Sequence, residues 1–313
     1  MKAMAIAEEE LQARLGRGEL VEGPEQASDG YLDALTRTLV SVADAELYGL
    51  PHYLMGAQDA PTINALISGI ALLQDEVGHA AIAYRLLRDL GVDADRVLYD
   101  RTVEGCRHPY SFDVPLETWA EFVVSTALMD RAGFHLLGDI FESTSYAPWR
   151  RALVKVHREE NFHMRLGERW MTILAETDEG REQVQRAVDW MFLLGLEFFG
   201  QPDSLKRHGD QLDYRLRGKS NDQLRQDWMR DAISQCERLG YRVPAHVEPE
   251  TGEAVLDTPY PLEFDIHEKR WLVERGPTTW DNVRERWKRR GPAAGWCLEQ
   301  IRRGHVELRG DAA

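Results

Sequence analysis

Two Glu-x-x-His motifs stand out in the chain, Glu76 to His79 and Glu160 to His163. Residues three apart lie on the same face of a helix, so each motif can direct a carboxylate and an imidazole at one metal ion. A single Glu-x-x-His motif is common by chance. Two such motifs are a stronger indication of a metal site if the sequence before each of them also repeats.

The spacing does repeat. Glu46 lies 30 residues before Glu76, and Asp130 lies 30 residues before Glu160. Two antiparallel helix hairpins of equal length would direct all six side chains at one place, which is how helical bundles build carboxylate-bridged dimetal sites. Four carboxylates and two imidazoles form a hard, oxygen-rich donor set that favours iron, or manganese, over zinc and copper. The predicted ligands, which are also the predicted catalytic residues, are Glu46, Glu76, His79, Asp130, Glu160 and His163.

Apolar residues recur with helical periodicity through long proline-free windows, and each predicted ligand interrupts an apolar stripe at a core position. The predicted helices span residues 29–49, 62–91, 116–143, 149–176, 180–198 and 220–239. The first is expected to begin at an Asp29 N-cap, and Pro148 to lie in the first turn of the fourth. This pattern predicts an all-α protein built on a four-helix bundle with additional helices.

Three further residues are predicted to support the ligands. Asp75 and Glu159 each precede a liganding glutamate, from where they are expected to accept a hydrogen bond from the second ring nitrogen of a histidine on another helix. Thr126 lies one turn before Asp130, where it is expected either to face a bound oxygen species or to pack in the core. For all three, a role in solvation or packing remains the alternative.

The sequence divides into three parts: an acidic, loosely held arm over residues 1–28, a helical domain over 29–243 that carries the metal site, and an irregular extension over 244–313. The extension is rich in proline and is expected to contain a small hairpin and then a basic helix near 281–303. Lys288, Arg289 and Arg290 in that helix are predicted to contact an anionic substrate or an acidic partner. A solvated amphipathic helix is the alternative.

Composition limits the remaining function classes. The 313 residues carry a net charge of −15, which disfavours nucleic-acid binding, and three scattered cysteines form neither a disulfide framework nor an iron–sulfur motif. No apolar run is long enough to span a membrane and no signal peptide is recognisable, so a cytoplasmic location is expected. A serine-hydrolase elbow, a Walker loop and a GxGxxG turn are absent, and the electrons for redox chemistry must therefore come from a partner.

The segments LLQDEVGHA around Glu76, HREENFHMRLG around Glu160 and RGKSNDQLRQDWMRDAISQCERLGYRVP at 217–244 resemble the family of catalytic A subunits of ring-1,2-phenylacetyl-CoA epoxidases. The resemblance runs from about Tyr31 to Arg303. It implies a ferritin-like fold with two iron ions at the six residues above, and a monooxygenase that uses O2 to epoxidise the aromatic ring of an acyl-CoA. It also implies a related ferritin-like scaffold subunit, or a second copy of the chain, and a separate NAD(P)H-dependent reductase.

Two departures from the family pattern affect the substrate. Leu72 occupies the place where the family has a lysine one turn before the first motif, and the segment ERGPTTWDN at 274–282 replaces a different family sequence. Leu72 is therefore predicted to contact a bulkier or less polar acyl group, and an oxygenase paralogue acting on another acyl thioester or a biosynthetic small molecule is the alternative. A ferroxidase, a ribonucleotide reductase small subunit and a metal-free scaffold remain weaker alternatives. The apolar helix at 180–198 is predicted to form the subunit interface.

Overall fold

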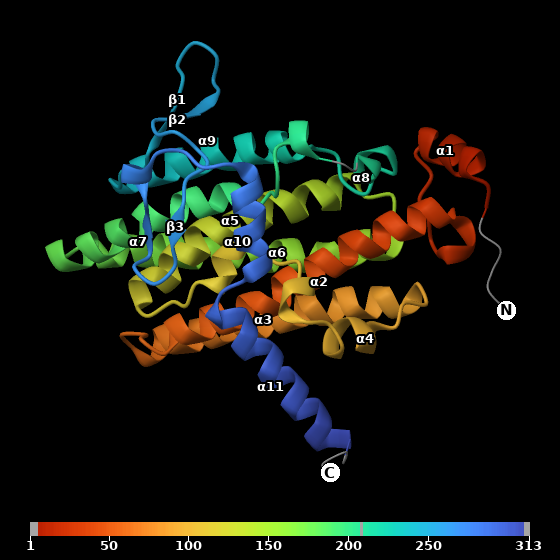
Figure 1. Cartoon of the computed structure of the whole chain (residues 1–313), viewed down its shortest axis with the longest axis horizontal. Helices are drawn as coiled ribbons and strands as arrows, with labels where there is room; N and C mark the ends of the chain where they lie inside the picture. The colour runs from red at the N-terminus through yellow and green to blue at the C-terminus, as the bar shows by residue number, and fades with distance from the viewer. Residues whose placement is uncertain (1–5, 207–208, 310–313) are drawn as a thin grey trace.

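The computed structural model describes residues 6–206 and 209–309, so the ends of the predicted arm and extension, residues 1–5 and 310–313, lie outside it. Two antiparallel hairpins form the core of the molecule (Figure 1). Helix α2 (Asp29–Ala57) pairs with α3 (Ile63–Asp89), and α5 (Trp119–Ser143) pairs with α6 (Ala147–Leu174). The predicted all-α, ferritin-like four-helix bundle with additional helices is confirmed.

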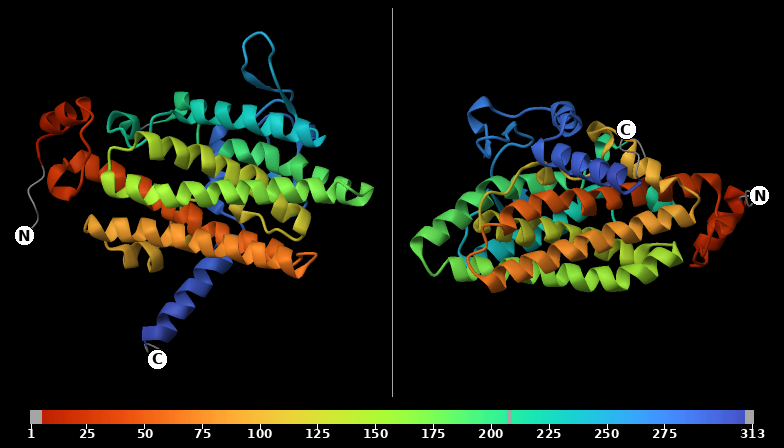
Figure 2. Two further views of the ribbon diagram at one scale, coloured as in Figure 1. Left: turned by 180° about the vertical axis from the view of Figure 1, so that it is seen from behind. Right: turned by 90° about the horizontal axis from the view of Figure 1, so that it is seen from below.

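The other helices pack around this bundle. Helices α7 and α9 cover α5, α11 lies across α2, and α1 and α8 lie near the first turns of α2 (Figures 1 and 2). None of the described helices is both long and apolar enough to cross a membrane. The bounds are α1 (Glu8–Gly16), α4 (Ala94–Tyr99), α7 (Asp178–Glu197), α8 (Asp210–Asp213), α9 (Asn221–Leu239), α10 (Trp280–Arg289) and α11 (Pro292–Arg309), with 3₁₀ turns η1 (Pro24–Gln26), η2 (Val103–Gly105), η3 (Tyr110–Asp113), η4 (Asp203–Leu205) and η5 (Val273–Arg275).

Hydroxyl side chains cap the starts of most of the long helices. Ser28, Thr62 and Thr118 each accept a hydrogen bond from the backbone N–H three residues later, and Ser220 forms a full capping box with Gln223. The N-cap of α2 is thus Ser28 rather than Asp29. The caps of α2, α3 and α5 fix where these helices begin and therefore how far along each axis its ligands lie. Helix α6 has no side-chain cap and instead has Pro148 in its first turn, as predicted.

Helix α2 continues two turns beyond the predicted end at residue 49, straight through Pro51. A proline inside a helix leaves the carbonyl four residues earlier without its backbone donor, here that of Leu47. The Cys297 thiol of α11 lies 3.9 Å from this carbonyl oxygen and offers it a weak replacement donor. The extra turns matter because they carry Tyr53 into the metal site.

The N-terminal arm is more firmly held than expected. Residues 8–16 form α1, in which Leu11 and Leu15 are buried, and Val21 pairs with Ser145 and Ala147 through backbone hydrogen bonds. The spacing of Leu11 and Leu15 is compatible with a helix, but two apolar residues among acidic ones were too weak a pattern to predict it.

Helix α7 does not present the free apolar face that was predicted to bind another subunit. Val184, Ala187, Met191, Phe192 and Leu194 are all buried within the chain. Helices α5 and α6, the η3 turn and strand β4 pack against α7, and the Trp228 ring of α9 lies against Gly195. The apolar surface of α7 is therefore used within the fold.

The C-terminal extension folds back on the bundle and shares its core through Phe264 and Trp271. It contains two small antiparallel pairs, β1 (Ala245–Val247) with β2 (Ala254–Leu256), and β3 (Phe264–Asp265) with β4 (Arg270–Trp271). The predicted single basic helix is divided at residues 290–291 into α10 and α11, where Arg290 has a φ of 55° and Pro292 begins the second helix.

A close contact between α5 and α6 gives a stability prediction. A Cβ atom added at Gly167 would lie 2.5 Å from the Ala127 nitrogen and 2.6 Å from the Val123 carbonyl oxygen, which are fixed backbone atoms. Gly167→Ala is therefore expected to lower the unfolding free energy of the metal-free protein by about 3 kcal/mol in urea titration. Gly78→Ala is the control, since nothing lies within 4 Å of its added methyl. It should gain roughly 0.5–1 kcal/mol in helix propensity. Equal effects of both changes would contradict this packing.

Candidate metal centre

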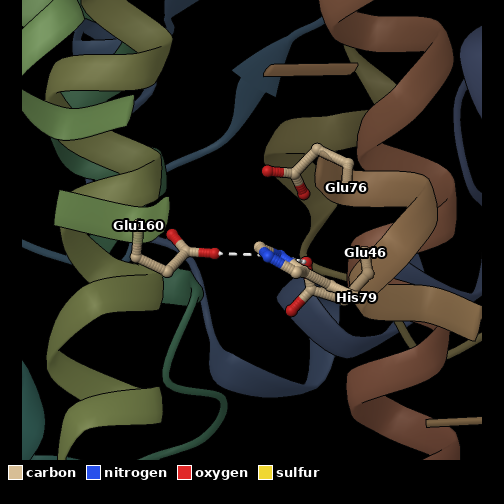
Figure 3. A group of neighbouring side chains, drawn as sticks. All are labelled: Glu46, Glu76, His79 and Glu160. Carbon is tan, nitrogen blue, oxygen red and sulfur yellow. Dashed lines mark hydrogen bonds and ion pairs between the residues drawn. The ribbon is translucent and has the colours of Figure 1, made fainter. Parts of the chain in front are cut away.

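The six predicted ligands meet in the interior of the bundle, one from α2, two from α3, one from α5 and two from α6. They form two overlapping groups with donor atoms within 4.8 Å of one another, Glu46 with Glu76, His79 and Glu160, and Glu76 with Asp130 and His163. Figure 3 shows the first group, in which side chains from α2 and α3 face Glu160 of α6. Glu76 belongs to both groups, as a carboxylate bridging two ions would.

Both histidines present the Nδ1 atom to the carboxylates. His79 Nδ1 lies 3.3 Å from Glu46 Oε2 and 3.4 Å from Glu160 Oε1. His163 Nδ1 lies 3.2 Å from Glu76 Oε1 and 3.9 Å from Asp130 Oδ2. All six residues are at least nine-tenths buried, so this is an interior site and not a solvated acidic face.

The pKa shifts of the cluster favour the binding of a cation. Burial, together with the charges of Glu46, Glu160 and Asp130, raises the pKa of Glu76 well above its usual range. Burial also raises the pKa of Asp130 to about 8, although the neighbouring His163 acts in the opposite direction. Burial lowers the pKa of His79, but hydrogen bonds to Glu160 and Glu46 outweigh it and raise the value to about 12. Multivalent cations would offset this repulsion between buried carboxylates.

Two buried atoms at the centre have no hydrogen-bond partner among the described residues, His163 Nδ1 and Asp130 Oδ2. Buried polar atoms are rarely left unpaired, and such atoms call for an explanation such as a bound ion. The two atoms lie 3.9 Å apart and belong to two members of the second ligand group. The donor chemistry, the shared Glu76 and these two atoms fit a pair of iron ions.

The second ring nitrogens of both histidines bond to the two carboxylates predicted for this role. His79 Nε2 lies 3.0 Å from Glu159 Oε2, and His163 Nε2 lies 3.4 Å from Asp75 Oδ2. Each bond crosses between α3 and α6, in opposite directions. A proton on Nε2 leaves Nδ1 with a free lone pair for a metal, so these bonds favour the tautomer that the site needs.

Tyr53 is a site residue that the sequence analysis missed. Its hydroxyl donates a hydrogen bond to Asp130 Oδ1. The second oxygen, Oδ2, has no hydrogen-bond partner among the described residues and is free to bind a metal ion. Tyr53 is fully buried and lies seven residues after Glu46, two helical turns along the same face of α2. This spacing would have revealed it if Pro51 had not indicated an earlier end to the helix.

Thr126 has a packing role. Its hydroxyl donates to the Val123 carbonyl at 2.9 Å, and the side chain lies against Gly167 at the α5–α6 contact. Of the two interpretations predicted for this residue, core packing is the one that these contacts favour.

A cavity of about 440 Å³ extends from Glu46 to the surface. Its apolar lining includes Leu137 and Phe198, and it also contains the cationic side chains of Arg107, Lys206, Arg217 and Arg290. A void of about 30 Å³ adjoins Glu46, Glu76, Asp130 and Glu160, and shares with the cavity the lining residues Ala45, Glu46, Gly133, Leu137 and Phe198. The site is thus reached through an apolar passage that also has basic side chains in its walls.

Only one of the four residues predicted to contact substrate lines this cavity. Leu72 is fully buried in the hydrophobic core and borders neither the cavity nor the void. Lys288 is exposed and paired with Glu285, and Arg289 borders a separate surface hollow. Arg290 does line the cavity, where its guanidinium also donates to the carbonyls of Cys106 and His108. The sequence analysis missed Lys206 and Arg217, because neither lies near a recognisable motif.

The fold and the site together define the class of this protein: a ferritin-like helical bundle with a buried Glu/His cluster suited to two iron ions. Residues 1–255 match the family model described as phenylacetic acid catabolic protein, and the chain belongs to this family. The predicted resemblance and the predicted enzyme class, a di-iron monooxygenase, are confirmed.

Two known proteins illustrate the similarity. The 1,2-phenylacetyl-CoA epoxidase of Escherichia coli (strain K12) has an A subunit that is 30% identical over 253 residues, which cover 78% of this chain and 81% of that protein. A solved structure of a Synechococcus protein with aldehyde deformylating oxidase activity has a TM-score of 0.49 and 20% identity, covering 69% of this chain and 93% of that one.

Proposed function

We propose that this chain is the catalytic component of an oxygenase that uses O2 to epoxidise or hydroxylate an aromatic acyl-CoA of the phenylacetyl-CoA type. The observation that carries the proposal is the cavity, because it joins an apolar chamber at Glu46 to the basic side chains of Lys206 and Arg217. An aryl group fits the first environment and the phosphates of CoA fit the second. The E. coli relative is named for the same kind of substrate.

The pKa of Lys206 and the hydrogen bonding of Arg217 support the binding of an anionic ligand. Burial and the charge of Arg217 lower the pKa of Lys206, because both disfavour its charged ammonium form. A bound phosphate would stabilise this charged form. Arg217 donates to Asn221 at 2.6 Å, while its buried Nε has no partner among the described residues. These groups bind and orient the thioester, and Leu137 and Phe198 keep water away from the reacting ring.

At the site itself, two bound iron ions would supply O2 activation and oxygen transfer. The six ligands would hold them, while Glu159 and Asp75 fix the histidine tautomers and Tyr53 restrains Asp130. Insertion of one oxygen atom into the ring and reduction of the other to water consume two electrons and two protons. We propose that a separate NAD(P)H-dependent reductase supplies the electrons, and that a related ferritin-like subunit or a second copy completes the assembly.

A single-turnover experiment tests the function without a reductase. Iron-loaded protein, reduced with dithionite and then freed of excess reductant, is exposed to ¹⁸O₂ with phenylacetyl-CoA, other acyl-CoA esters or free phenylacetate. We expect mass spectrometry to find ¹⁸O in phenylacetyl-CoA and none in the free acid. Preference for another acyl-CoA would favour the paralogue alternative, and absence of ¹⁸O from every thioester would contradict the proposed function.

A further inference from the structure

One face of α3 is free of charge over most of its length. Ile63, Ile67 and Ile70 are 69%, 56% and 52% exposed, and the same stripe continues through Gln74, Val77 and Ala81. These six residues recur every three or four positions and follow one side of the helix for about 27 Å. Large exposed apolar patches on a soluble protein usually mark an interaction surface. We call this set the α3 stripe.

The neighbouring face of α6 adds positive charge to the α3 stripe. Its exposed stripe consists of Val154, Arg158, Phe162, Arg165 and Arg169, with Lys155 beside it. No hydrogen bond or ion pair to another described residue holds the guanidinium groups of the three arginines. Helices α3 and α6 lie side by side on the side turned away from the viewer in Figure 1 and toward the viewer in the left view of Figure 2.

This apolar and basic surface belongs to a chain with a net charge of −15. Two copies of it would repel each other, because each would place arginines opposite arginines. An acidic partner would instead meet a complementary rim around an apolar centre, with Phe162 and the arginines as the residue types that most often anchor interfaces. Charge complementarity therefore favours an acidic protein over a second copy.

The same surface lies directly over the histidine side of the metal centre. Asp75 and Glu159, which bond to His163 and His79, are 26% and 22% exposed at their side chains, whereas the ligands are buried. The substrate cavity lies elsewhere, because its described lining residues include none from α3 or α6. A protein bound over α3 and α6 would reach the centre through two short hydrogen-bonded links without obstructing the substrate.

We propose that α3 and α6 form the docking surface for an acidic one-electron carrier protein. This inference rests on the proposed function, which requires an external electron source. With two iron ions held by the six ligands, two successive dockings would each deliver one electron from a reduced carrier, which supplies the two electrons that the proposed reaction consumes. Glu159 with His79, and Asp75 with His163, connect the docking surface to the ligands.

The test uses the iron-loaded chain and a reduced plant-type [2Fe–2S] ferredoxin as the probe. Stopped-flow absorbance gives the bimolecular rate of electron transfer, and thermophoresis gives the dissociation constant of oxidised ferredoxin. In the double variant Arg158→Glu/Arg165→Glu we expect the rate at low ionic strength to fall, and the dissociation constant to rise, by about tenfold or more. Added salt should slow the wild-type reaction and have little effect on the variant.

The matched control is Arg186→Glu/Arg242→Glu, which changes net charge equally at exposed positions on α7 and after α9. It should retain the wild-type rate and affinity. Dithionite reduction and single-turnover ¹⁸O transfer should be the same in all three proteins, which separates docking from the proposed function. Equal effects in both double variants, equal losses with dithionite and ferredoxin, or no reaction of wild-type protein with ferredoxin would each overturn the inference. So would a loss of oligomer assembly in Arg158→Glu/Arg165→Glu without a change in ferredoxin binding.

Discussion

Replacement of Glu76 by glutamine is expected to remove most of the bound iron and to lower turnover by about a hundredfold or more. Glu76 belongs to both ligand groups, so its loss weakens the binding of both ions. Glutamine keeps the volume of the side chain and removes its negative charge. Metal analysis of the purified variant, loaded and washed in parallel with wild-type protein, measures the effect.

The same substitution should have the opposite effect on the metal-free fold. Burial and three neighbouring carboxylates raise the pKa of Glu76 well above its usual value, so the charged form is unfavourable in the folded protein. The metal-free variant is therefore expected to unfold at a higher temperature than metal-free wild type at neutral pH. Glu142→Gln, at an exposed position on α5, is the control and should change neither property. Full iron occupancy together with a lower unfolding temperature would contradict the ligand assignment.

Leu137→Trp is expected to abolish oxygen transfer while leaving the iron in place. Leu137 borders both the large cavity and the small void next to the carboxylates, so an indole there fills the passage to the metals. Displacing a substrate by an ångström from its reactive position costs about a hundredfold in rate, and we expect at least this loss in single-turnover ¹⁸O incorporation.

Two measurements accompany the cavity variant. Iron content and thermal stability show whether the larger side chain has disturbed the bundle, since overpacking typically costs about 1–3 kcal/mol. Val255→Trp, at an exposed position on β2, is the control and should retain activity. Unchanged ¹⁸O incorporation in Leu137→Trp would show that substrate does not pass this way, and would remove the main support for the proposed substrate class.

The sequence was most informative where periodicity and chemistry coincide. The six ligands lie at core positions of helices with matched spacing, and buried carboxylates are costly unless they serve a purpose, so their meeting in one place was predictable. The positions of Asp75 and Glu159 followed from the same helical geometry. Both bond to histidines on the opposite helix in the structure.

Features that depend on tertiary contacts were not predictable in this way. A proline normally ends a helix, but Pro51 lies inside α2, where the Cys297 thiol offers the Leu47 carbonyl a weak donor and tertiary packing holds the helix. Without the last turns of α2, Tyr53 had no predicted place in the site. The apolar face of α7 resembled a subunit interface because periodicity shows that a face is buried and does not show what buries it. Here α5, α6, η3 and β4 bury it within the same chain.

The interpretation of Leu72 failed for a related reason. Its position one turn before Glu76 placed it near the ligands in sequence, but the side chain is directed into the hydrophobic core. Lys206 and Arg217 come instead from the segment between α7 and α9, far from any motif in the sequence. A cavity formed by separate segments is visible only in three dimensions.

The most direct test of the central claim is the iron stoichiometry of the purified chain, measured with Mössbauer spectroscopy of ⁵⁷Fe-loaded protein. Six ligands in two groups that share Glu76 predict two iron ions per chain, in two coordination environments that are magnetically coupled in the ferric state. Magnetically isolated iron, one ion per chain, or no specific iron binding would contradict the account.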